Sequence, residues 1–131
     1  MSLKNLMIIK ALVCLLFGIL LLAVPDELLS IFGATLSDGG IFTAREYGCA
    51  LFGNLFLCWF ARNAAESDAR RAIILALFVY DLIAFFMTTL TVISGVLNLL
   101  GWSIAIIYLF FTIGFGYFLV KPPVTQSIEF K

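Results

Sequence analysis

The chain contains no histidine among its 131 residues. This absence removes the commonest protein ligand for transition metals and the usual general base near neutral pH. It also excludes a haem or a chlorophyll held by an imidazole of this chain. Any metal or cofactor chemistry would have to use other side chains.

Charge is also scarce. Charged residues make up 12% of the chain and hydrophobic residues 63%, whereas about 25% of an average soluble domain is charged. The mean hydropathy is +1.15. The eight basic and eight acidic residues balance, so no basic surface for nucleic acid is indicated. This composition is typical of an integral membrane protein, whose outer surface faces lipid.

The three cysteines, Cys14, Cys49 and Cys58, form no Cys-x-x-Cys motif and lie inside apolar runs. Thiols in such surroundings usually behave as small hydrophobic side chains. A disulfide-relay enzyme of the membrane would need paired, accessible cysteines. The sequence also shows no nucleophile–base pair and no set of metal ligands. We therefore expect no enzymatic activity and no bound metal.

Four stretches are long and apolar enough to cross a bilayer, which takes roughly 20 residues of helix. They cover about residues 5–24, 41–61, 72–93 and 102–120. Pro25 ends the first, and Pro122 and Pro123 end the last, because proline cannot continue a helix. Short connections require neighbouring helices to be antiparallel. The predicted fold is an all-α, single-domain, antiparallel up-down bundle of four transmembrane helices.

The first connection predicts a helix of its own. In residues 25–32 the apolar side chains fall at helical spacing behind an acidic first turn. Such a segment is expected to lie on the outer membrane surface.

The orientation follows from the basic residues, which collect at alternate ends of the four spans. Seven of the eight define this pattern: Lys4, Lys10, Arg62, Arg70, Arg71, Lys121 and Lys131. The first connection carries only Asp26, Glu27 and Asp38, and the third, residues 94–101, carries no charge. Both termini are therefore predicted to be cytoplasmic, and a bacterial inner membrane is the expected location.

Each predicted helix has one face of small or polar residues, as helix packing in lipid requires. Placing residues at 100° intervals gives four such faces, which we expect to point inward. They contain Lys10, Cys14 and Gly18; Glu46, Cys49, Ala50, Gly53 and Asn54; Asp81, Ala84, Thr88 and Thr91; and Ala105, Tyr108 and Thr112.

Asp81 is the most informative of these residues. It lies about nine residues, or roughly 13 Å, into its span, where a carboxylate needs a partner or a proton. Lys10, Asn54 and Tyr108 are candidate partners at its depth. A structural role in holding the bundle together is favoured over a proton-titrating or cation-binding role in transport.

Arg45 and Glu46 form a second polar group near the outer end of the second span. We expect Glu46 to point into the bundle and bond to the outer loops, including Asn98, while Arg45 reaches outward to lipid phosphates. A site for an anion or a partner at Arg45 is the functional alternative.

The layout, with a second span rich in small residues and Gly101-Trp102 at the start of the last, resembles small bacterial tetraspan proteins of the DoxX-like kind in architecture alone. Small multidrug transporters also have four spans, but they carry a glutamate in the first helix, where this chain has only Lys10.

Two functions follow as hypotheses. The first is a non-enzymatic accessory or structural subunit, in contact with membrane lipids and with other membrane subunits or copies of itself. The alternative is a small oligomeric transporter or channel that uses Asp81. Aromatic residues make up 15% of the chain, and composition does not distinguish their contact with lipid tails from contact with a pigment or a quinone.

Overall fold

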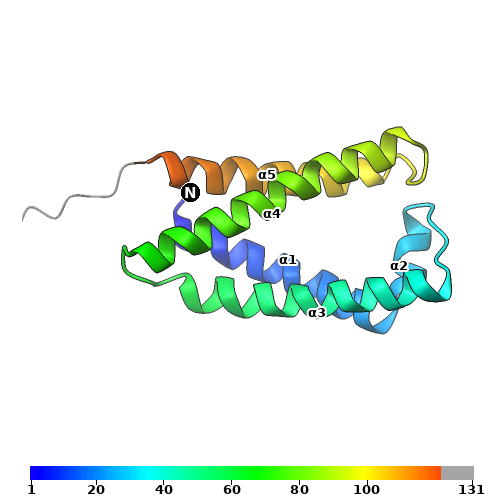
Figure 1. The fold of residues 1–131 in the computed structure, drawn as a ribbon, viewed down its shortest axis with the longest axis horizontal. Coiled ribbons are helices and arrows are strands. Elements are labelled where there is room, and N and C mark those ends of the chain that lie inside the picture. The colour runs from blue at the N-terminus through cyan, green and yellow to red at the C-terminus, as the bar shows by residue number, and fades with distance from the viewer. Residues whose placement is uncertain (122–131) are drawn as a thin grey trace, which may run out of the picture.

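The computed structural model describes residues 1–121, which form five helices and no strand (Figure 1). In chain order these are α1 (Leu3–Ala23), α2 (Pro25–Ile31), α3 (Asp38–Ala61), α4 (Asp68–Ile93) and α5 (Gly101–Val120). The all-helical class is confirmed, and α2 occupies the predicted short helix. Pro122, Pro123 and Lys131 lie outside the described residues.

Three of the long helices begin earlier than their apolar stretches, because serine N-caps set their starts. The hydroxyl oxygens of Ser2, Ser37 and Ser67 accept hydrogen bonds from backbone N–H groups three residues later, at 3.2, 3.2 and 3.1 Å. Each cap satisfies an N–H group that the first helical turn leaves unpaired. Hydropathy misses these first turns because they contain polar residues.

Three helices, α1, α4 and α5, are long and apolar enough to cross a membrane. The second predicted span, residues 41–61, corresponds to α3, which has 24 residues but is not among these three. Its hydropathy is reduced by Arg45, Glu46 and Asn54.

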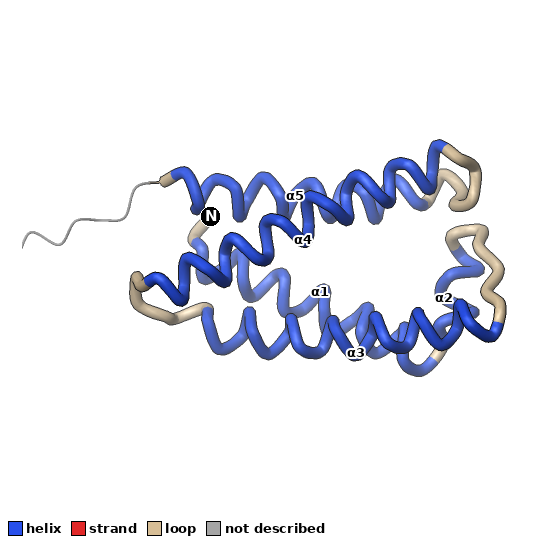
Figure 2. Tube along the Cα trace, viewed as in Figure 1, coloured by secondary structure: helices blue, strands red, loops and turns tan. Residues whose placement is uncertain are grey.

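The long helices form two closely packed pairs, α1 with α3 and α4 with α5 (Figures 1 and 2). Glycines allow the backbones of the first pair to approach. A Cβ atom on Gly48 would lie 3.2 Å from the carbonyl oxygen of Gly18, and one on Gly18 would lie 3.1 Å from the Phe52 ring. The two pairs lie close together at the end that carries the N-terminus and are separated at the end that carries α2 (Figure 1).

Asn98, in the connection between α4 and α5, bridges the two pairs at the α2 end. Its backbone N–H donates to the Phe32 carbonyl oxygen at 2.7 Å, and its side-chain amide donates to the Ile31 carbonyl oxygen at 2.9 Å. The expected bond between Glu46 and Asn98 is therefore wrong. Asn98 instead satisfies carbonyl groups that the end of α2 leaves free.

Candidate functional site

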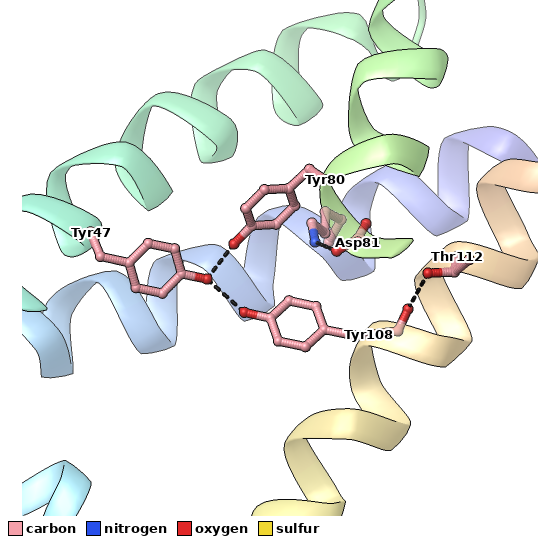
Figure 3. Close-up of polar contacts among 6 residues, drawn as sticks. Tyr47, Tyr80, Asp81, Tyr108 and Thr112 are labelled. Atoms are coloured by element: carbon pink, nitrogen blue, oxygen red, sulfur yellow. Dashed lines mark hydrogen bonds and ion pairs between the residues drawn. The ribbon is translucent and has the colours of Figure 1, made fainter. Parts of the chain in front are cut away.

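Asp81 lies halfway along the 26-residue helix α4 and is fully buried. Its Oδ1 atom forms an ion pair with Nζ of Lys10 from α1, which is also buried (Figure 3). Each charge is the countercharge of the other in an apolar interior, where a single unpaired charge would be costly. The ion pair joins the α1–α3 pair of helices to the α4–α5 pair.

Aromatic rings surround the Lys10 ammonium. Its Nζ atom lies 4.5 Å from the ring centre of Phe111, 4.9 Å from that of Tyr80 and 5.8 Å from that of Tyr108. Ring faces carry negative potential, so these contacts stabilise a cation in a site that excludes water. The rings and Asp81 together favour the charged form of Lys10.

Three tyrosine hydroxyls meet beside the ion pair. Tyr47 extends from α3 between Tyr80 of α4 and Tyr108 of α5, and its hydroxyl bonds to both (Figure 3). The oxygen atoms of Tyr47 and Tyr108 are 2.6 Å apart. The rings of Tyr80 and Tyr108 contact edge to face, with centres 6.1 Å apart. This tyrosine cluster, Tyr47, Tyr80 and Tyr108, connects three of the four long helices.

Of the three partners considered for Asp81, the structure places Lys10 against it. Tyr108 lies beside Lys10 but bonds to Tyr47, and Asn54 is half-buried on α3 with no hydrogen bond among the described residues. The sequence reasoning missed Tyr47 and Tyr80. The sequence contained a signal for both. Tyr47 directly precedes Gly48, the glycine that packs against α1, and Tyr80 directly precedes Asp81.

The predicted inward face of α3 is wrong. Glu46, Cys49, Ala50 and Gly53 are exposed, and so is Arg45. The buried residues of this helix are Gly48, Leu51, Cys58 and Ala61. Gly48 explains the difference, because it is the small residue that allows α1 to approach. The outward face that remains, Arg45, Glu46, Cys49, Ala50 and Gly53, is called the α3 outer face below.

The cluster around Asp81 contains no nucleophile next to a base. Thr112 donates its hydroxyl to the carbonyl oxygen of Tyr108 at 2.8 Å, and the thiols of Cys14 and Cys58 are buried and unpaired. Within residues 1–121, no three His, Cys, Asp or Glu side chains lie together in a way that could hold a metal ion. The arrangement suits holding helices together and donating hydrogen bonds.

A cavity of about 600 Å³ lies on the α2 side of the tyrosine cluster. Residues of all five helices and of the connection before α3 line it, and most of them are apolar. Lys10, Thr43 and the three tyrosines contribute its polar part.

No protein family, curated protein or solved structure matches this chain.

Proposed function

We propose that this chain is a non-enzymatic accessory subunit of a larger membrane protein assembly. It would cross a bacterial inner membrane four times, as an antiparallel bundle with both termini in the cytoplasm. The observation that carries the proposal is the α3 outer face, which presents charged and small side chains on the outside of the protein.

This face is poorly suited to lipid. Arg45 and Glu46 lie seven and eight residues after the start of α3 at Asp38, which corresponds to about 10–12 Å along the helix. Charged side chains at membrane depth are costly unless paired or directed to water. Arginine can extend to the lipid phosphates, whereas the shorter Glu46 side chain has less reach. A helix of another subunit could provide the missing hydrogen-bond donors.

Small residues on the same face favour a helical partner. A Cβ atom on Gly53 would meet nothing within 4 Å, so an approaching helix would find no obstruction there. In lipid, small residues at four-residue spacing, such as Cys49 and Gly53, allow two helix backbones to come close. The glycine at position 48 has this role inside the chain, and Gly53 is available for it outside.

The proposed orientation rests on the ends of the helices. Lys4 lies at the start of α1, Arg62 directly after the end of α3, and Arg70 and Arg71 in the first turn of α4. These helix ends lie at the end of the molecule that carries the N-terminus (Figure 1). Lys10 no longer counts as a flanking charge, because it is buried against Asp81. The α2 end carries Asp26, Glu27 and Asp38. Basic residues mark the cytoplasmic side of membrane proteins.

The test is photo-crosslinking in native membranes. A benzophenone amino acid replaces Gly53 in one variant and Ile106 in a matched control; Ile106 is 64% exposed on α5. We expect the probe at position 53 to give an adduct of discrete mass with another polypeptide or a second copy of the chain. The probe at position 106 should label lipid. Lipid adducts alone at both positions would contradict the proposal.

A small oligomeric transporter or channel is the second candidate, supported by one atom. Oδ2 of Asp81 is buried without a hydrogen-bond partner among the described residues, and such an oxygen can accept a proton or a cation. The ion pair with Lys10 weighs against it. Flux measurements distinguish the two candidate functions. Ion and proton fluxes are compared between liposomes that contain equal amounts of folded wild-type protein and of the Asp81→Asn variant. Equal fluxes would dismiss transport through Asp81.

A further inference from the structure

The cavity beside the tyrosine cluster is a distinct feature of the fold, because it occupies the space where the two helix pairs separate. Its volume of about 600 Å³ lies within the range of 300–1,000 Å³ typical of small-molecule sites. Apolar side chains form most of its wall, among them Phe17, Leu21, Leu28, Phe32, Leu51 and Ile107. A molecule inside it would be mainly apolar.

The polar part of the wall offers a hydrogen-bond donor. The hydroxyls of Tyr47, Tyr80 and Tyr108 carry one proton each, and the two bonds between them use two protons. One O–H group of the cluster is therefore always left without an acceptor inside it. All three tyrosines line the cavity, so this donor is available to an occupant.

The charge of the site selects the type of acceptor. Lys10 is the charged residue among those that line the cavity, and the Asp81 carboxylate balances it. A site that is neutral overall offers little compensation for the cost of moving an anion into an apolar interior. A neutral carbonyl oxygen accepts a hydrogen bond without that cost.

We infer that this cavity binds an apolar molecule with a carbonyl head group, which accepts a hydrogen bond from the tyrosine cluster while the apolar part lies toward α2. This inference goes beyond the proposed accessory role and does not depend on it. A bilayer offers such a carbonyl from two sources, the ring of a quinone and the ester of an acyl lipid.

The test is competition for photolabelling of the full chain in lipid nanodiscs. The label is an alkyl ketone with a diazirine in its tail, and the competitors are methyl nonyl ketone and undecane, which share their chain length. We expect the ketone to compete at about tenfold lower concentration than the alkane, as one hydrogen bond contributes roughly that factor. Equal competition would overturn the inference, because it would mark the cavity as a space for any hydrocarbon.

Two matched variants locate the site. Ile107→Trp fills the cavity, whereas Ile106→Trp adds the same side chain to the exposed neighbouring position. We expect labelling to fall on the order of tenfold in the first, at unchanged helicity by circular dichroism, and to stay at the wild-type level in the second. Equal labelling of the two variants would place the label outside the cavity and overturn the inference.

A third variant tests the donor. Replacing the cluster by Tyr47→Phe, Tyr80→Phe and Tyr108→Phe keeps the rings and removes every hydroxyl. The ketone should then compete no better than undecane, and a persisting advantage would contradict the inference.

Two further competitors identify the source of the carbonyl group. Methyl decanoate represents the ester of an acyl lipid, and a decyl-substituted benzoquinone represents a quinone. The one that displaces the label at the lower concentration identifies the source. Failure of both at concentrations where the ketone competes would also overturn the inference.

Discussion

The two ends of the molecule differ in how their helices meet. At the end that carries the N-terminus, all four long helices contribute to one buried cluster, which consists of Leu3, Leu6, Met7, Ala11, Cys58, Ala61, Ile74, Leu77, Phe111 and Phe115. Toward α2, the buried cluster comes from α1, α2 and α3 alone, with Cys14, Leu21, Leu28 and Leu51. There α4 and α5 separate from the other pair (Figure 1). The cavity lies between the two pairs at this end.

The change occurs at the level of Lys10, Asp81 and the tyrosine cluster. On one side of this level, side chains from four helices interlock, and on the other side Asn98 connects the separated pairs at α2. The comparison indicates that polar contacts join the helix pairs where apolar packing between them stops. Four predictions test this difference, from the largest expected effect to the smallest.

Asp81→Asn should have the largest effect. It leaves the Lys10 ammonium buried without its countercharge, and removing one partner of a buried ion pair typically costs about 3–5 kcal/mol. Reversible unfolding by sodium dodecyl sulfate in mixed micelles measures the loss. Lys10→Met should show a loss of similar size, because it leaves Asp81 unpaired. A loss below about 1 kcal/mol in both would show that the pair does not hold the helices together.

Phe115→Ala should come next, with a loss of about 3 kcal/mol, because truncating a buried phenylalanine leaves a cavity in a packed core. Phe115 is completely buried in the four-helix cluster. Phe17→Ala is the comparison, since Phe17 is half-buried and already lines the cavity. We expect less than half the loss there by the same unfolding assay. Equal losses would contradict the difference between the two ends.

Gly48→Leu should cost about 1–3 kcal/mol, as overfilling a tight contact usually does. A Cβ atom at this position would already lie 3.1 Å from Leu22 and 3.2 Å from the Gly18 carbonyl oxygen. Gly53→Leu makes the same change in open space on the same helix. In the purified chain, Gly53→Leu should leave the free energy of unfolding unchanged or raise it slightly. A larger loss at position 53 would mean that α3 presents its other face to α1.

Asn98→Ala should have the smallest effect, about 1 kcal/mol, because both side-chain bonds that it removes are exposed. One is donated to the Ile31 carbonyl oxygen, and the other is accepted from the Leu100 N–H. The backbone bond from residue 98 to Phe32 remains. We expect the amides of α2 to exchange with deuterium faster while those near Leu77 keep their protection. Unchanged exchange in α2 would show that Asn98 does not connect the helix pairs.

The sequence predicted the helices well because their determinants are local. Apolar runs of sufficient length gave the long elements, and Pro25 with the acidic turn after it gave α2. The inward faces of α1 and α5 followed from Lys10, Cys14, Ala105 and Thr112, all of which are buried.

The face of α3 could not be obtained in this way. Small residues occur on two sides of this helix, with Gly48 on one and Gly53 on the other. Periodicity places both correctly around the helix axis but does not show which one meets α1. Glu46 led to the wrong face of α3, because a charged side chain in an apolar stretch was expected to turn away from lipid and toward the other helices of the same chain. The tyrosine cluster was missed for the same reason, since Tyr47 lies on the buried side.

The coupling free energy between Lys10 and Asp81 tests the central claim most directly. It compares the unfolding free energies of wild type, Lys10→Met, Asp81→Asn and the double variant, which removes both charges. If the pair joins the two halves of the molecule, the double variant should regain most of the stability that each single variant loses, with a coupling of about 2–4 kcal/mol. Additive losses, with no coupling between the two positions, would contradict the account.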